Sequence, residues 1–594
     1  MNLPTPTTRI AALQARLRQA EVAAWIVPTA DPHQSEYVAE HWQERAWLSG
    51  FSGSAGTLVV TQTGAGLWTD PRYHLRGESE LAGSGIVLHR AGLAGVPSYA
   101  EWLAENLNDG DRLGFNAERM SIAEIERLQR AFGLQKVEIY TRFDLAGSLW
   151  TDRPPLPADP LRLYDERFAG ESRREKLARI RAEMAQAGVD GYLLTALDEI
   201  AWTFNIRGSD VAYNPVAIAY AFISLHEIHL FVHPGKVDPT SRAALAGDGV
   251  SLLDYTAIAP FWNGLPSNSR VFIDPTKTSY HFLATKPDGC HLHRAQSIAA
   301  RLKAVKNARE AEGFRSAHLR DGVAMVRWLI WLEEAVPTES HTEITLGEKL
   351  AELRSQGEHY RGESFGTITG YGPNSAVGHY SPRPETTPTV RPAGLLLSDS
   401  GGQYEDGTTD ITRTIALGPP SDEARRVFTT VLKCHIRLAT TRFPQGTTGS
   451  QLDALAREFL WREGWNCRHG IGHGVGHFLN VHEGPQRFST DNRVALQPGM
   501  VTSNEPGVYF TGKFGVRLEN LLLCVADSTT DFGDFYRFET LGLCPFDLSL
   551  VDASRLDETE RDWLNNYHRR VYDSLAPLLN PAERVWLYKA TRRI

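Results

Sequence analysis

Hydrophobic positions recur at helical spacing near the start of the chain and then change to a strand-like pattern. Ile10, Leu13 and Leu17 lie three to four positions apart, which predicts an amphipathic helix over residues 8–20. The apolar run 23–27 and the segment 58–70 are typical of strands. We therefore expect an α/β domain that ends near residue 160, in the proline-rich linker TDRPPLPADP.

The pattern of this first domain returns later in the chain. Two stretches align with later ones, the second across a shorter connecting loop: 19–27 with 186–194, and 47–54 with 202–209. This repeat predicts two copies of one α/β domain, residues 1–160 and 161–302. From residue 303 the pattern becomes helical, and after about residue 550 it is an amphipathic, helix-rich tail. Residues 303–594 are therefore expected to form a third domain, with a C-terminal extension at about 550–594.

Composition narrows the classes of function. The chain has 594 residues, 42% hydrophobic and 22% charged, with a net charge of −9, which opposes a nucleic-acid partner. The longest apolar run, 216–225, is half of the roughly twenty residues that span a membrane, so we expect no membrane partner. Five scattered cysteines without a CxxC pair predict free, buried thiols in a reducing cytoplasm. The acid-poor start is compatible with a transit peptide, but its periodicity favours a first helix.

Two aspartates mark the segment with the most chemistry. An apolar run ends at Asp399, and the alternating stretch 408–415 carries Asp410 near its start. The turn-rich residues between them predict two strands joined by a tight connection, with the carboxylates face to face. Such carboxylates repel one another unless a cation lies between them. An ordinary polar turn would also explain these two residues taken alone.

Three later segments favour the cation. RHGIGHGVGHFLNVHEGP (468–485), TSNEPGVYF (502–510) and VRLEN (516–520) add His473, Glu505 and Glu519. Four carboxylates and one imidazole, without a thiolate, suit two hard or borderline divalent cations such as Mn²⁺. Their negative charges balance two such ions, and a bridging water can then ionise near neutral pH.

The histidine spacing in the first of these segments has a second interpretation. His469, His473 and His477 lie four apart, which on a helix would form a zinc-binding face. Alternating glycines oppose a helix and favour extended, closely packed backbone. Only His473 is therefore taken as a ligand, and His477 as a structural or wall residue.

The ordered set Asp, Asp, His, Glu, Glu resembles that of the pita-bread metallopeptidases. The motifs DSGGQYEDGTTDITRT, GHGVGHFLNVHEGP and NEPGVYF are similar to those of the aminopeptidases P, or Xaa-Pro aminopeptidases, in their long three-domain form. The motif DWLNNYH in the C-terminal extension is also similar, so the resemblance covers the whole chain. It implies an α/β (α+β) fold class, with two creatinase-like N-terminal domains before a pita-bread catalytic domain.

The resemblance also implies an activity. The expected protein is a cytoplasmic, homodimeric hydrolase that cleaves between an N-terminal residue and a penultimate proline. It would use two Mn²⁺ ions, or other divalent metals such as Co²⁺ or Zn²⁺, and a hydroxide that bridges them. In the family pattern Asp399 holds one ion, Asp410 and Glu519 bridge both, and His473 and Glu505 complete the second.

Further roles follow from the same resemblance. His379 matches a histidine that binds the substrate near the scissile bond, His482 one that stabilises the tetrahedral intermediate, and His469 a further pocket histidine. Arg72 matches an arginine of the first domain that reaches the substrate. For His469 and Arg72, a structural or solvated role stays open as the alternative.

Two of the charged residues have additional expected roles. Glu505 is expected beside the bridging water, where it can take the proton of that water and pass it to the leaving proline nitrogen. Arg517 can hold a bridging carboxylate through charge-assisted hydrogen bonds.

Three rival functions remain. A prolidase-type dipeptidase shares the catalytic motifs, but such enzymes are usually shorter, with one N-terminal domain. A creatinase-like amidinohydrolase lacks the metal ligands that this chain has. A non-catalytic peptide-binding module of the same fold would be expected to have lost some of them.

Overall fold

The computed structural model describes residues 5–594, so Met1 to Pro4 of the expected first domain lie outside the described residues. The chain folds into two compact units. The first contains the residues up to Tyr164 and Glu171–Ala300, and the second contains Asp165–Gly170 and Arg301–Ile594. The two expected α/β domains therefore share one unit, and each unit is described by itself below.

The first sheet of the first unit is six-stranded and begins after the predicted helix. That helix, α1 (Pro6–Gln19), starts at a capping box of Thr5 and Thr8 and buries Ile10, Leu13 and Leu17, as predicted. The strand order is β4 (Val87–Arg90), β3 (Ala65–Thr69), β2 (Thr57–Thr61), β1 (Ala24–Pro28), β5 (Arg112–Phe115) and β6 (Glu138–Tyr140). Strand β1 pairs antiparallel with β2 and parallel with β5.

The second sheet of this unit repeats the first. Its order is β12 (Val250–Leu253), β11 (Ile228–Val232), β10 (Ala219–Ser224), β8 (Gly191–Leu194), β13 (Arg270–Ile273) and β14 (His291–Arg294). Strand β8 pairs antiparallel with β10 and parallel with β13, as β1 does with its neighbours. Because β1 and β8 are also the strands that the sequence alignment superposes, the predicted pair of related domains is confirmed.

The second unit holds the catalytic motifs on two antiparallel sheets. The smaller has the order β17 (Ile368–Tyr371), β19 (Leu395–Ser400) and β22 (Ile411–Ala416). The larger has the order β23 (Phe443–Pro444), β30 (Gly533–Thr540), β29 (Asn520–Thr530), β26 (Val501–Asn504), β24 (Gly472–Gly474) and β25 (Glu483–Phe488). Helices α15 (Asp422–Thr440) and α16 (Gly449–Arg462) bury an apolar cluster against these sheets, with Phe428 and Val431 fully inside.

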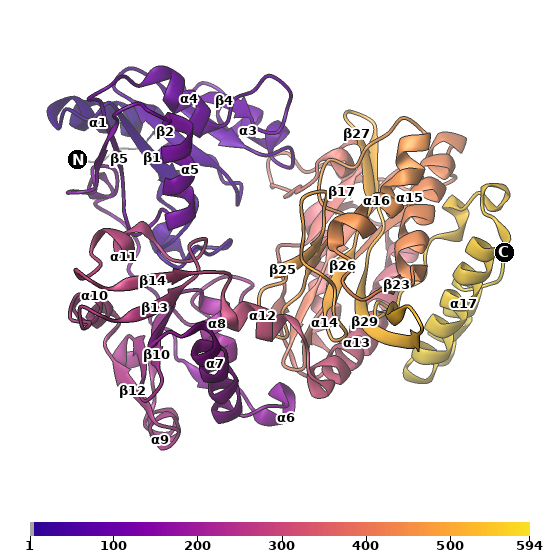
Figure 1. Cartoon of the computed structure of the whole chain (residues 1–594). Coiled ribbons are helices and arrows are strands. Elements are labelled where there is room, and N and C mark those ends of the chain that lie inside the picture. The colour runs from indigo at the N-terminus through magenta and orange to yellow at the C-terminus, as the bar shows by residue number, and fades with distance from the viewer. Residues whose placement is uncertain (1–4) are drawn as a thin grey trace. The chain divides into compact units, whose positions relative to one another are not determined.

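The C-terminal extension packs onto this unit as helices. It forms α17 (Glu558–Leu575) and α18 (Pro581–Ala590), drawn in yellow in Figure 1. Arg413 of β22 is buried and joins α17 to the sheet, since its guanidinium donates to the Glu519 carbonyl at 2.6 Å and to the Tyr567 hydroxyl at 2.9 Å. The extension therefore contacts the same strand that follows Asp410.

A buried ionic cluster fastens the start of the second unit to strand β25. The ammonium groups of Lys303 and Lys306 both pair with the carboxylate of Glu483, the former at 2.8 Å. All three side chains are at most 3% exposed. In a buried cluster each charge depends on its partners, because none can be solvated instead.

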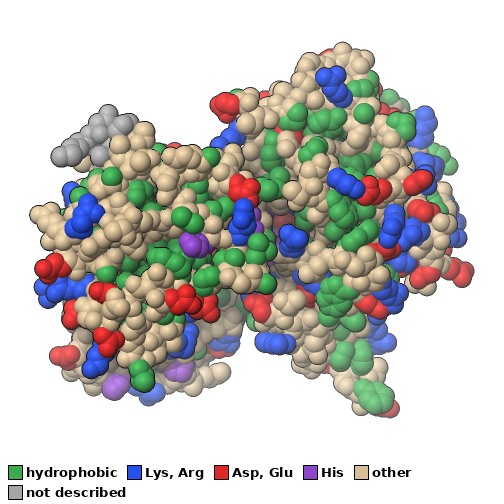
Figure 2. All heavy atoms as spheres, turned by 90° about the horizontal axis from the view of Figure 1, so that it is seen from above, with side chains coloured by type: hydrophobic (Ala, Val, Ile, Leu, Met, Phe, Trp, Pro, Cys, Tyr) green, Lys and Arg blue, Asp and Glu red, His purple; other side chains and the backbone are tan. Residues whose placement is uncertain are grey.

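The surface shows no comparable concentration of one charge on the face drawn in Figure 2, where acidic and basic side chains are interspersed. None of the helices in residues 5–594 combines the length and the apolar character needed to cross a bilayer. All five cysteines are free and buried, as predicted.

We predict that Glu483→Ala destabilises the protein strongly, because two buried ammonium groups lose their counter-charge. The expected loss is about 3–5 kcal/mol of unfolding free energy, measured by urea denaturation of the metal-loaded protein. Glu458→Ala is the control, since it removes an exposed pair with Arg462 and should cost less than about 0.5 kcal/mol. Equal effects of the two substitutions would contradict the importance of the buried cluster.

Candidate metal centre and active site

Strands β19 and β22 bring the two aspartates together. They pair antiparallel with Asp399 opposite Thr412, and Asp410 directly precedes β22. The predicted strand pair is therefore confirmed, but the tight connection is wrong. The ten residues between the strands contain a small hairpin of their own, β20 (Gly402–Tyr404) and β21 (Gly407–Thr408).

The larger sheet supplies the other three residues of the set. His473 lies in β24, Glu505 directly follows β26, and Glu519 lies between β28 (Phe514–Arg517) and β29. The ligand atoms of Asp410, His473 and Glu519 all lie within 4.8 Å of one another. His473 Nε2 is 3.4 Å from Asp410 Oδ2 and 3.5 Å from Glu505 Oε1, so Glu505 joins the same cluster.

Glycine is required beside His473 because β24 is enclosed by backbone. A Cβ on Gly472 would lie 2.0 Å from the Ser503 carbonyl oxygen, and one on Gly474 would lie 2.3 Å from that of Glu483. The extended backbone that the glycines predicted is confirmed here. His477 is 2% exposed and packs edge-on against Phe314, which fits its predicted structural role.

Burial and mutual repulsion shift the pKa values of the groups in this cluster. Burial raises the pKa of Asp399 to about 6, with Asp410 and Glu505 adding to the rise against the charge of Arg517. Burial, followed by the other three carboxylates, raises the pKa of Glu519 well above its usual range. Burial lowers the pKa of His473, but Asp410 and Glu505 outweigh this and raise it to about 9. The positive charge of His473 does not remove the repulsion among the carboxylates, since the pKa values of Asp399 and Glu519 stay raised, and further positive charge would stabilise the cluster.

The residues fit divalent cations. Asp399 Oδ1 is buried without a hydrogen-bond partner, and its geometry leaves this oxygen available as a ligand. His473 donates from Nδ1 to the Gly474 carbonyl at 2.9 Å, which leaves the Nε2 lone pair for a metal. Carboxylate oxygens with one imidazole form a donor set for ions such as Mn²⁺, whereas a zinc structural site would favour thiolates.

Arg517 holds Asp399 rather than either carboxylate that is expected to bridge. Its Nη2 donates to Asp399 Oδ2 at 2.5 Å, so the expected partner was wrong although the kind of contact was right. Its Nη1 donates to the Tyr509 hydroxyl at 2.6 Å, and that hydroxyl lies 2.7 Å from His469 Nε2. His469 is therefore connected to Asp399 through two side chains.

The other predicted histidines lie near the cluster. The rings of His473 and His482 are 4.3 Å apart between centroids, and those of His482 and His379 are 6.5 Å apart. His379 comes from the loop after β17, and His482 directly precedes β25. The structure thus brings His379, His469 and His482 around the metal cluster.

Arg72 lies in the first unit, where both ends of its guanidinium pair with Asp70. Nε donates to Oδ1 at 2.9 Å and Nη2 donates to Oδ2 at 2.8 Å. A contact between Arg72 and the substrate remains a prediction.

Several residues of the site were missed in the sequence. Thr412 donates to Glu519 Oε2 at 2.7 Å, and Ser503 accepts from the His473 backbone N–H at 3.0 Å. Tyr509 links Arg517 to His469, as described above. The alternating stretch 408–415 could have indicated Thr412, which lies two positions after Asp410, whereas Tyr509 lies in the separate strand β27 (Gly507–Phe510) and had no such signal.

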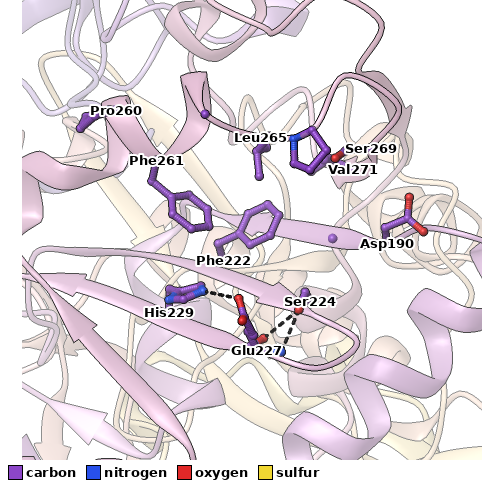
Figure 3. A pocket seen from close by; sticks show the side chains of 13 residues that line it. Asp190, Phe222, Ser224, Glu227, His229, Pro260, Phe261, Leu265, Ser269 and Val271 are labelled. Carbon is purple, nitrogen blue, oxygen red and sulfur yellow. Dashed lines mark hydrogen bonds and ion pairs between the residues drawn. The ribbon is translucent and has the colours of Figure 1, made fainter.

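A pocket elsewhere in the chain does not contain this chemistry. It has a volume of about 500 Å³ and lies between α10 (Ile258–Asn263) and strands β10 and β11 of the first unit (Figure 3). Phe222, Phe261 and Leu265 line it, together with Glu227, which pairs with His229 at 3.2 Å. None of the predicted site residues lines it, and the convergent carboxylates of the second unit mark the better candidate.

The fold and the carboxylate-rich cluster define a metal-dependent peptidase of the pita-bread class. The model of metallopeptidase family M24 matches residues 312–526, and that of its C-terminal region matches 534–594. Models of the creatinase/prolidase N-terminal domain match residues 9–141 and 152–310. These four matches follow the order of the domains in the chain.

Comparison with individual proteins shows which group of this family the chain resembles. The probable Xaa-Pro aminopeptidase P of Coprinopsis cinerea is 39% identical over 99% of this chain and 98% of its own. Aminopeptidase P2 of Arabidopsis thaliana is 39% identical over 96% of this chain and 86% of its own. The crystal structure of X-prolyl aminopeptidase from Caenorhabditis elegans, described as a cytosolic enzyme with a di-nuclear active site, covers 100% of both chains with 34% identity and a TM-score of 0.96. The chain belongs to metallopeptidase family M24, as one of its aminopeptidases P.

We predict a pH-dependent loss of stability in the metal-free protein. With the pKa of Asp399 near 6 in the folded state and about 3.9 in the unfolded state, the folded chain binds more protons between these values. Its free energy of unfolding therefore falls, relative to that of Asp399→Asn, as the pH rises from about 4 to 6. Urea unfolding in a chelator across this range measures the difference in stability between the two proteins, and parallel curves would refute the raised pKa of Asp399.

At pH 7, added Mn²⁺ should raise the unfolding temperature of the wild type.

Proposed function

We propose that this protein is a dinuclear metal-dependent Xaa-Pro aminopeptidase, which removes the N-terminal residue from peptides with proline at the second position. The observation that carries the proposal is the convergence of Asp410, His473, Glu519 and Glu505 beside Asp399, in a chain that matches aminopeptidases P along its whole length. The X-Pro bond is a tertiary amide without an N–H, so a peptidase that binds extended backbone by that N–H rejects it.

The ligand set divides between two cations in this proposal. Asp399, Asp410, His473, Glu505 and Glu519 would hold them. When bound, the cations supply a Lewis acid for the scissile carbonyl and a water of lowered pKa. We propose Mn²⁺ as the ion, with Co²⁺ and Zn²⁺ as other candidates.

The protein groups then perform the proton transfers and hold the substrate. Glu505 takes the proton of the attacking water and delivers it to the proline nitrogen when the C–N bond breaks. His482 and His379 donate N–H groups to the oxygen that becomes negative, which favours the tetrahedral intermediate. Arg517 keeps Asp399 ionised and oriented, while His469 and Arg72 contact the peptide.

Cleavage of a short Xaa-Pro-Yaa peptide tests the proposal. The chelated protein reconstituted with Mn²⁺ should release the N-terminal residue, and Asp410→Ala should lose at least about 100-fold in kcat/KM because a shared ligand is removed. Elemental analysis of the same samples should give two ions per chain in the wild type. Full activity of Asp410→Ala, or of the chelated protein, would refute metal catalysis.

The same assay separates the rival functions. A dipeptidase would hydrolyse Xaa-Pro and leave Xaa-Pro-Yaa intact. A binding module would bind the tripeptide without cleaving it after reconstitution. The dipeptidase alternative is not favoured, since the Xaa-Pro dipeptidase of Bacillus anthracis covers 64% of this chain, with a TM-score of 0.51 that shows the shared fold alone.

We further propose a cytoplasmic homodimer. The five free thiols and the cytosolic description of the Caenorhabditis elegans enzyme support the compartment. Light scattering coupled to size exclusion should give a mass near twice the 66.0 kDa of one chain. A single-chain mass at micromolar concentration would contradict the dimer.

A further inference from the structure

The loop that carries His379 has little regular structure of its own. Between β17 and the short strand β18 (Thr389–Val390) it contains one 3₁₀ turn, η5 (Gly372–Ala376). Ser375 and Ala376 are buried in that turn, but His379 and the residues that follow it to Thr387 are half-buried or exposed. Apolar burial therefore contributes little to the order of the part of the loop that presents His379.

A buried carboxylate binds this loop along its length. Glu343 is 0% exposed and lies at the start of helix α14 (Glu343–Ser355). Its Oε1 accepts from the Tyr371 backbone N–H at 2.7 Å and from Asn374 Nδ2 at 2.9 Å. Its Oε2 accepts from the Tyr380 hydroxyl at 2.6 Å and from the Thr387 hydroxyl at 3.1 Å. The donors thus come from the start, the middle and the end of the loop, and Tyr380 is the residue next to His379.

The chemistry of these contacts requires a carboxylate at position 343. An ionised carboxylate only accepts hydrogen bonds and has room for about four, which matches the four neutral donor groups here. A glutamine would turn an N–H₂ toward two of the donors and leave buried groups unpaired. Burial and the neighbouring Glu343 raise the pKa of Tyr380, so its hydroxyl stays protonated as a donor.

The carboxylate itself is held by rigid elements. Helix α14 begins at a capping box of Thr342 and Thr345 and buries Leu346 and Leu350 in the core. The Thr369 hydroxyl of β17 donates to the Glu343 carbonyl at 2.5 Å, and β17 pairs with β19 so that Ile368 lies opposite Asp399. Glu343 therefore connects the loop to the same framework that positions a metal ligand.

We propose that Glu343 is a positioning residue, which orders loop 371–387 and thereby sets the place of His379 opposite His482 in the active site. This inference deepens the proposed function, because His379 acts on the peptide there. A shift of about 1 Å in a group that contacts the reacting atoms can cost on the order of 100-fold in rate.

Two measurements on the full-length, Mn²⁺-loaded protein test this role of Glu343. In Glu343→Gln, hydrogen exchange of the backbone in 371–387 should accelerate while α14 and β19 stay protected. The same substitution should lower kcat/KM for Xaa-Pro-Yaa by about 10- to 100-fold at unchanged metal content. Glu560→Gln is the matched control, a buried glutamate in the capping box of α17, and it should change neither quantity.

A double-mutant cycle shows whether Glu343 acts through His379. In a His379→Ala background, adding Glu343→Gln should lower kcat/KM by less than about twofold, because the group that Glu343 positions is already absent. Full additivity of the two losses would overturn the proposal, and so would unchanged exchange of the loop in Glu343→Gln. If that variant fails to fold, Tyr380→Phe removes the donor beside His379 and should give the same pattern in milder form.

The exchange measurement also separates this proposal from the proposed function. If the wild type cleaves no Xaa-Pro-Yaa peptide, the function is refuted, while the loop order that Glu343 provides is still measured directly. If the wild type is active and the loop of Glu343→Gln stays ordered, only the role of Glu343 is refuted.

Discussion

Four carboxylates share a buried space in this protein, and much of the catalytic unit is arranged around their repulsion. Asp399, Asp410 and Glu519 are at most 8% exposed, and burial, together with the neighbouring carboxylates, raises the pKa of Asp399 and of Glu519. Water cannot screen such charges, so positive charge must be supplied within the site. Arg517 supplies part of it next to Asp399, and the donor set fits divalent cations for the rest.

Holding the ligands against this repulsion requires a rigid framework. Each comes from a strand or from a residue directly beside one, and strands β24 and β26 approach so closely that Gly472 has no room for a side chain. Arg413 adds a second support, because it donates to the Glu519 backbone and to Tyr567 of the C-terminal extension. The extension thus stabilises the metal centre from outside without contributing a ligand.

The histidines around the centre are placed by a different device. His379 lies on a loop whose following residues are half-buried or exposed, and His482 directly precedes strand β25. Buried carboxylates lie next to these segments: Glu343 accepts hydrogen bonds from the loop of His379, and Glu483 binds Lys303 and Lys306 directly after His482. A buried carboxylate with several polar partners orients a segment more sharply than apolar contacts do, because its hydrogen bonds depend on direction.

The sequence by itself indicated the carboxylates that meet at His473, the repeated N-terminal domain and the helices of the first and last segments. These follow from local patterns, since residue type, glycine alternation and hydrophobic period act over a few positions. Only the tertiary structure decided the partner of Arg517, the hairpin inserted between Asp399 and Asp410, and the roles of Thr412, Tyr509 and Glu343. Each of these depends on which distant strands become neighbours; Glu343 precedes its last partner, Thr387, by 44 positions. Because these hydrogen bonds join elements that lie far apart along the chain, spacing can mark a residue such as Thr412 but cannot identify its partner.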